Sequence, residues 1–154
     1  MLFRSLAFPA LTDADTLEVT SNGALETMRI EADIGSITIE ENDSLVTLEL
    51  PALDSGSRIG IFGCDALADL DGLAGVTRMG SLWVDGNASL ASVAGLSTLT
   101  STSSWLWFAD NDALTDLTGL ESVASVGGDL GIVENDALID VTALSGVKIG
   151  RAHV

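Results

Sequence analysis

The chain has 154 residues, of which 47% are hydrophobic and 19% charged, and its 23 Asp and Glu against 6 Lys and Arg give a formal net charge of −17. A surface this acidic repels phosphate backbones and anionic lipids, which excludes nucleic-acid binding through a basic patch. Apolar residues are too frequent for a disordered acidic chain, yet no apolar run approaches the ~18 residues that cross a bilayer, so we expect a folded protein without membrane insertion.

The first residues do not read as a secretory signal. Between Met1 and Leu11 the chain offers one basic residue, Arg4, and a short apolar stretch that Pro9 interrupts. A spacing of three residues, which returns along the whole chain, begins here with Leu2, Ser5, Phe8 and Leu11. We therefore expect the chain to begin partway through a structural repeat of a longer protein.

A column of mostly Asn residues then recurs at intervals of 20 to 24 residues, at Asn22, Asn42, Cys64, Asn87, Asn111 and Asn135. Apolar residues stand five and three positions before each member, as in Ile37 and Ile39, and this alternation predicts a short strand with one buried face. Apolar residues also follow at steps of three, which fits a return path of turns and short 3₁₀ segments.

Each repeat is thus expected to form one strand and one irregular return, and it can bury its apolar side only by stacking on its neighbours. We predict an all-β, right-handed β-solenoid of about six rungs with one parallel sheet, forming a single domain over residues 1–148. At the corner after each strand, the Asn amide can bond backbone groups of its own and neighbouring turns, and Cys64 is expected to be a small buried substitute.

This pattern resembles leucine-rich repeats, in which Leu stands five and three residues before an Asn or Cys. Two features set it apart: the next Leu falls three residues after the column rather than two, and Gly tends to precede the strand, as in Ile34-Gly35-Ser36-Ile37. Both resemble the receptor L-domain branch, found in extracellular parts of growth-factor receptors and in bacterial and fungal surface proteins. The resemblance covers nearly all of residues 12–148, departing from the pattern between Pro51 and Gly56. It implies an extracellular or cell-surface location and the binding of peptides or glycans.

Outward-facing positions of the predicted sheet carry an aromatic cluster. If the residues five and three before the column point inward, those six, four and two before it face solvent. These positions hold the candidate ligand-binding residues Phe62, Trp83, Asp85, Trp105 and Trp107. Exposed rings beside a carboxylate suit a sugar, whose apolar face stacks while its hydroxyls donate hydrogen bonds. Alternatively, the rings stack on one another as a cross-strand ladder, or another segment of the parent protein covers them.

Acidic residues gather around the Asn column, at Glu41, Asp43, Asp65, Asp110, Asp112, Glu134 and Asp136. Calcium needs about six to eight oxygens around one point, and the chain has no Asp-x-Asp-x-Asp-Gly loop or glycine-rich nonapeptide repeat. We interpret this corner as a solvated acidic edge and expect no metal site or cofactor.

The last six residues, Ile149 to Val154, break the repeat and contain the only histidine, His153. They match the translation of a common short-read sequencing adapter, so we expect residues 149–154 to be adapter read-through and the chain to be a fragment. Without His153 the chain has no imidazole base, and Asp85, Asp110 and Asp129 are the only candidate catalytic carboxylates beside the aromatic residues.

Together these patterns predict a non-catalytic recognition module, extracellular or at the cell surface, that binds a glycan or protein partner on the aromatic face. One alternative is a purely structural stalk, and another is a carbohydrate-active solenoid enzyme. Because neither end carries a polar cap, we also expect end-to-end self-association through the open sheet edges.

Overall fold

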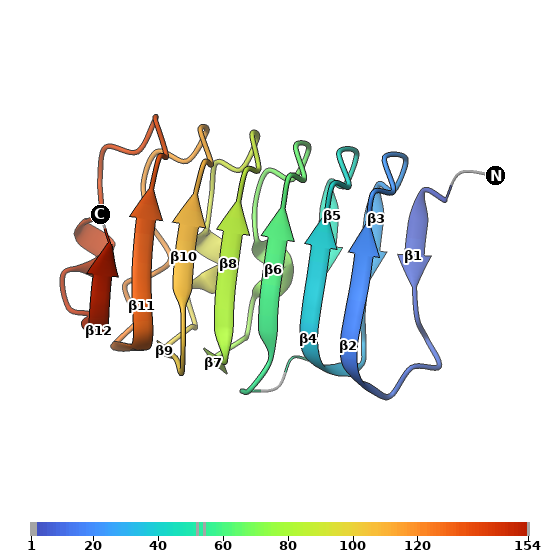
Figure 1. The fold of residues 1–154 in the computed structure, drawn as a ribbon, viewed down its shortest axis with the longest axis horizontal. Coiled ribbons are helices and arrows are strands. Elements are labelled where there is room, and N and C mark those ends of the chain that lie inside the picture. The colour runs from blue at the N-terminus through green and yellow to red at the C-terminus, as the bar shows by residue number, and fades with distance from the viewer. Residues whose placement is uncertain (1–2, 52, 54, 154) are drawn as a thin grey trace.

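The computed structural model describes residues 3–51, 53 and 55–153; residues 1–2, 52, 54 and 154 lie outside this description. The chain is an all-β solenoid of about six turns, as predicted. In Figure 1 it rises along the front strands, crosses over the top to the rear and advances from right to left, which is a right-handed winding. The front strands are β2 (Asp13–Thr20), β4 (Asp33–Glu40), β6 (Arg58–Phe62), β8 (Ser81–Asp85), β10 (Leu106–Ala109), β11 (Ser125–Val133) and β12 (Lys148–His153).

The main sheet is parallel, and its register is the one that the Asn column predicts. The residue five positions before the column pairs with its equivalent on the next strand, in the series Leu17, Ile37, Ile59, Leu82, Leu106 and Leu130. A slip by one residue would turn every apolar side chain toward solvent, so burial of one face enforces this register. β12 continues the sheet beside β11, so residues 149–153 lie in a strand; their origin as adapter read-through stays a prediction.

The return path is more regular than predicted in the first turns. There it forms a second parallel sheet from β1 (Ser5–Ala7), β3 (Thr27–Arg29) and β5 (Thr47–Glu49). Later returns contain the expected 3₁₀ turns, η1 (Asp71–Leu73), η2 (Ala94–Leu96) and η3 (Thr142–Leu144). The two-residue strands β7 (Arg78–Met79) and β9 (Ser101–Thr102) join the start of β11 and extend the main sheet around its lower corner.

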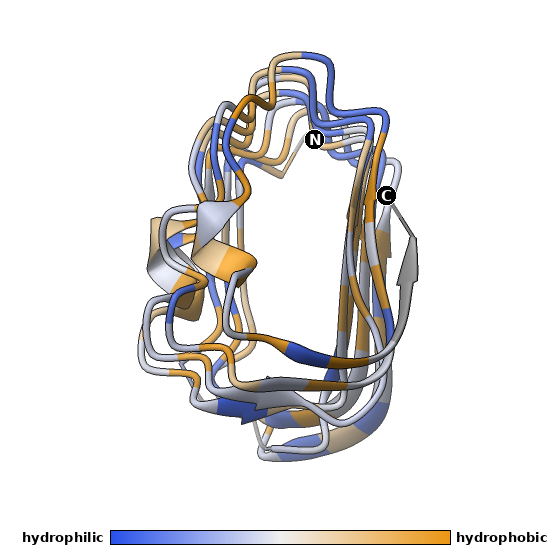
Figure 2. Cartoon of the chain, turned by 90° about the vertical axis from the view of Figure 1, so that its left-hand side faces the viewer, coloured by the Kyte–Doolittle hydropathy of each residue, from blue (hydrophilic) through white to orange (hydrophobic). Residues whose placement is uncertain are grey.

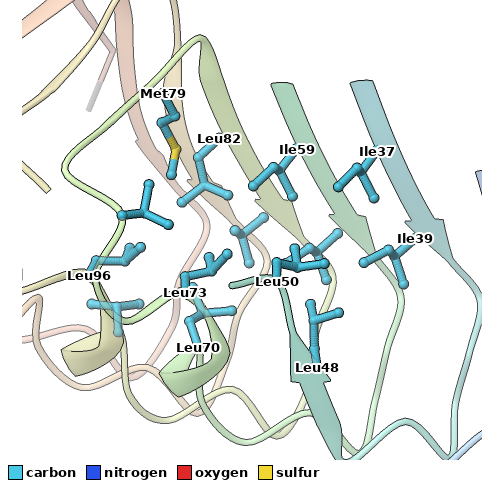
Figure 3. Close-up of a cluster of buried hydrophobic side chains, with 14 of the residues drawn as sticks. Ile37, Ile39, Leu48, Leu50, Ile59, Leu70, Leu73, Met79, Leu82 and Leu96 are labelled. Carbon is cyan, nitrogen blue, oxygen red and sulfur yellow. The ribbon is translucent and has the colours of Figure 1, made fainter. Parts of the chain in front are cut away.

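The core lies between the main sheet and the returns. Viewed along the solenoid axis, the turns superimpose into one elongated outline (Figure 2). Ile37, Ile39 and Ile59 point from the main sheet toward Leu48 and Leu70 of the returns (Figure 3), and all five are at most 6% exposed. Because the inner turns repeat this arrangement, burial of apolar surface is continuous along most of the axis and supplies most of the stability.

Each later return begins with a side chain that caps it, a feature the sequence pattern did not predict. Asp116 Oδ1 accepts the backbone N–H of Thr118 at 2.9 Å, and Asp140 Oδ1 accepts that of Thr142 at 2.8 Å. In the same way, Asp69 accepts the backbone N–H of Asp71 and Ser92 accepts that of Ala94, each two turns before its Asp counterpart. Hydrogen bonds from the side chain and backbone of Thr118 favour the ionised form and hold the pKa of Asp116 below its usual value, and those from the backbone and side chain of Thr142 lower the pKa of Asp140.

The residue just before the Asn column adopts a left-handed backbone in every turn, and it is glycine in only two of them. Ser21, Glu41, Asp110 and Glu134 all have φ between 51° and 57°, in the same place as Gly63 and Gly86. A Cβ atom in this conformation costs about 1–2 kcal/mol. The chain therefore stores local strain at this corner.

We expect Glu134→Gly to raise the free energy of unfolding by about 0.5–1 kcal/mol, because relief of the left-handed strain exceeds the entropy that glycine loses on folding. Glu134→Ala is the matched control: it removes the same charge but keeps the Cβ atom. The Tm of Glu134→Gly, measured by thermal unfolding with circular dichroism, should exceed the Tm of Glu134→Ala and that of wild type. Equal Tm values for the two variants would show that charge, not backbone strain, governs this position.

Candidate functional site

The structure brings the four predicted aromatic residues into one cluster on the outer face of the main sheet, which we call the aromatic patch. Trp83 of β8 and Trp107 of β10 are direct partners across neighbouring strands. Trp83 also contacts Phe62 at the end of β6 and Trp105 just before β10, with ring centroids 5.9 and 6.2 Å away. The contacts of the predicted ring ladder are thus present, yet Trp83 and Trp105 keep 37% and 47% of their surface exposed.

Two glycines form the floor of the aromatic patch, and the sequence pattern did not indicate their role. A Cβ atom on Gly131 would lie 2.2 Å from the ring of Trp107, and one on Gly60 would lie 2.4 Å from the ring of Phe62. Each ring therefore occupies the space that a side chain on the glycine would need. Any larger residue at either position would displace the ring.

The three indoles enclose a small pocket. It has a volume of about 210 Å³ and is lined by Trp83, Trp105, Trp107 and Asp129. The rings of Trp83 and Trp105 stand at 88° to each other, and that of Trp107 is tilted by 46° from Trp83. The tryptophans thus form a corner rather than a flat platform, with one carboxylate at its edge.

Two carboxylates stand beside the indoles in different roles. Asp85 Oδ2 accepts a hydrogen bond from Trp83 Nε1 at 3.2 Å, so Asp85 orients the central ring of the aromatic patch. Asp129 lines the pocket itself, although the sequence indicated it only as a candidate catalytic group. It stands in the same outward column as Trp105, one turn later, and that shared column is the signal that could have placed it in the ligand-binding set.

The predicted Asn ladder runs behind this surface and holds the turns together. Asn111 Nδ2 donates to the carbonyls of Val84 and Ala109 at 3.0 and 2.8 Å, and its Oδ1 accepts the N–H of Asn87 at 3.2 Å. Asn42, Asn87 and Asn135 repeat this pattern, each with two carbonyl acceptors and one backbone N–H donor from the preceding turn. Asn22, the first of the column, is exposed and bonds only within its own turn through Nδ2, to Thr20. These hydrogen bonds connect the corners of neighbouring turns.

Cys64 occupies the same column as a buried thiol, as predicted. Its Sγ lies 3.6 Å from the carbonyl oxygen of Phe62, which is a weak hydrogen bond. Burial raises the pKa of the Cys64 thiol, and nearby Asp43 and Asp65 raise it further, while hydrogen bonds from Asn42 act in the opposite direction. A thiol held protonated in this way is a poor nucleophile.

Cys64→Asn should stabilise the solenoid by about 1 kcal/mol, because an amide can form the strong backbone hydrogen bonds that the other ladder positions make. Cys64→Ala, which forms none, should be at or below wild type. Chemical denaturation of wild type, Cys64→Asn and Cys64→Ala measures the order of their free energies of unfolding. A less stable Asn variant would mean that the turns around residue 64 lack room for an amide.

The acidic residues around the ladder are all exposed, in agreement with a solvated edge. Within the described part of the chain, no group of three or more His, Cys, Asp and Glu residues is arranged to hold a metal ion. A hollow of about 640 Å³, larger than the tryptophan pocket, lies at the other end of the main sheet beside Asp13, Asp15 and Asp33. Exposed acids and backbone line it, and it offers a ligand no aromatic wall.

The fold defines the chain as a β-solenoid repeat protein. Comparisons with protein-family models, with curated proteins and with solved structures found no match. Across the described residues, no helix combines the length and apolarity needed to span a bilayer.

Proposed function

We propose that this chain is a non-catalytic recognition module of an extracellular or cell-surface protein, built as a leucine-rich-repeat solenoid of the receptor L-domain type. Its ligand, a glycan or a partner protein, binds on the aromatic patch. One observation carries the proposal: every tryptophan of the chain lies on the outer face of the main sheet, outside the hydrophobic core. Clustered exposed aromatic surface of this kind marks interaction sites.

The local construction of the aromatic patch supports binding rather than a purely structural role. A stalk needs only stacked turns, whereas this face places glycines close beneath Phe62 and Trp107. Although the rings contact one another edge to face, the three indoles also line a pocket. Preorganised aromatic side chains bind with little loss of side-chain entropy, which is the usual property of a binding surface.

The carboxylates near the aromatic patch support a non-catalytic role. Asp85 is engaged with the indole of Trp83, and Asp110 lies in the turn that follows β10. A glycosidase needs two carboxyl groups that face each other across the scissile bond. Asp129 is the only carboxylate that lines the tryptophan pocket.

Affinity electrophoresis through gels that contain soluble polysaccharides tests the proposal. At least one polysaccharide should retard the wild-type protein, and Trp105→Ala should weaken that interaction by at least about tenfold, as expected for an aromatic anchor of a binding site. Ile139→Ala is the matched control, because Ile139 is 90% exposed and lies outside the aromatic patch. Equal losses in both variants would indicate non-specific adhesion and contradict a site at the tryptophans.

A further inference from the structure

The geometry of the tryptophan pocket restricts the shape of its ligand. Trp83 and Trp105 stand nearly perpendicular and Trp107 is tilted by 46° from Trp83, so the pocket is lined by three differently oriented rings. A flat sugar ring stacks best on one exposed indole face, whereas a roughly spherical group can contact three differently oriented faces at once. The volume of about 210 Å³ likewise suits one compact group rather than a polysaccharide chain.

The chemistry of the walls favours a cation with an apolar surface. The face of an indole carries negative electrostatic potential, which attracts a cation placed within about 6 Å of the ring centroid. Methyl groups around the charge would fill the apolar corner, and Asp129 supplies a full opposite charge at its edge. A neutral sugar would instead need several converging hydrogen-bonding groups, and the indole N–H of Trp83 is already bonded to Asp85.

The net charge of the whole protein also favours a cationic ligand. The chain carries a formal net charge of −17, and acidic residues outnumber basic ones in the outward columns of the main sheet, with Glu18, Glu40, Asp85 and Asp129 against Arg58 and Arg151, which pairs with Asp129 across β11 and β12. This field concentrates cations near the sheet and repels anions. A ligand that also carried a phosphate beside its ammonium group would lose part of this attraction.

From these observations we infer that the corner formed by Trp83, Trp105, Trp107 and Asp129 binds the quaternary ammonium group of a small choline-type cation that bears no attached anionic group. The inference rests on the proposed binding role of the aromatic patch, and it assigns that patch a small cation in place of a glycan or a partner protein. The rings supply cation–π contacts and apolar walls, and Asp129 supplies charge complementarity.

Titration of tryptophan fluorescence with choline chloride tests this inference, with ionic strength held constant by sodium chloride. The comparison ligand is 3,3-dimethylbutan-1-ol, which has the same shape as choline but no charge. Choline should bind at least about tenfold more tightly than this alcohol, because the alcohol lacks the cation–π and ionic contributions. Phosphocholine should bind more weakly than choline, because the acidic face repels its phosphate.

Two variants locate the effect. Asp129→Asn should weaken choline binding by about three- to tenfold while leaving binding of the alcohol unchanged. Asp136→Asn is the matched control, since it removes one exposed carboxylate from the acidic corner without altering the pocket, and it should bind choline as wild type does.

Other results would overturn the inference. Equal affinity for choline and the neutral alcohol would show simple apolar binding. Sedimentation with phosphatidylcholine vesicles in the absence of any response to free choline would show recognition of a membrane surface instead. Binding of a polysaccharide without binding of choline would refute the cation while leaving the proposed function intact. No response to any polysaccharide, vesicle or choline would count against both.

Discussion

Replacing Asn111 with alanine should lower the free energy of unfolding by about 3–5 kcal/mol, because the side chain is fully buried and satisfies several backbone groups at once. Its loss leaves the carbonyls of Val84 in β8 and Ala109 in β10, and the N–H of Asn87 just after β8, without these bonds. Each buried polar group left unsatisfied costs about 1–3 kcal/mol. Denaturant unfolding followed by far-UV circular dichroism measures the change.

Asn22 provides the matched control for the ladder. It occupies the same column, but its side chain is exposed and its Nδ2 bonds only to the carbonyl of Thr20. Asn22→Ala should therefore cost about 1 kcal/mol or less. If Asn111→Ala is no more destabilising than Asn22→Ala, the ladder does not hold the turns together in the way that its hydrogen bonds indicate.

Phe108→Ala should cost a similar amount, about 3–5 kcal/mol, through loss of buried apolar surface and the cavity left behind. Phe108 is 0% exposed on β10, directly between Trp107 and Ala109 in the chain, and its side chain enters the core while that of Trp107 faces out. Trp105→Ala, which removes a larger but half-exposed ring from the outer face, should cost about 1 kcal/mol. Thermal denaturation of both variants compares the two faces.

The comparison of these two aromatic positions checks the register on which the binding site depends. A large loss of stability in Trp105→Ala with little loss in Phe108→Ala would mean that the inner and outer faces of the main sheet are assigned the wrong way round. The tryptophans would then be core residues, and no aromatic patch would be available to a ligand.

The sheet register and the position of the Asn ladder could be predicted from the sequence because they repeat. Alternation of Ile37 and Ile39 around a polar residue has only one arrangement that buries both, and six copies of the pattern agree. The short strands β3 and β5 could not be predicted in the same way. Three residues are too few to separate a spacing of two from a spacing of three, and their strand pairing depends on contacts between turns.

The grouping of the tryptophans on one face followed from the same register, but the pocket between them did not. Its shape depends on how far each ring turns, and of the three indoles that line it only Trp107 lies against Gly131. Asp129 enters the pocket because it lies one turn beyond Trp105, a relation that matters only once the ring directions are known. Side-chain orientation, rather than backbone pattern, is the part that a sequence motif does not encode.

The most direct test of a recognition role is the tryptophan emission of the folded protein, recorded alone and during titration with soluble polysaccharides and with choline. All three tryptophans line the proposed site, so a ligand that excludes water from it must alter the signal. We expect emission characteristic of partly solvated indoles that shifts to shorter wavelength and saturates with one ligand. Emission that is already at short wavelength and unchanged by every ligand would show rings packed against protein, and would contradict a binding site on this face.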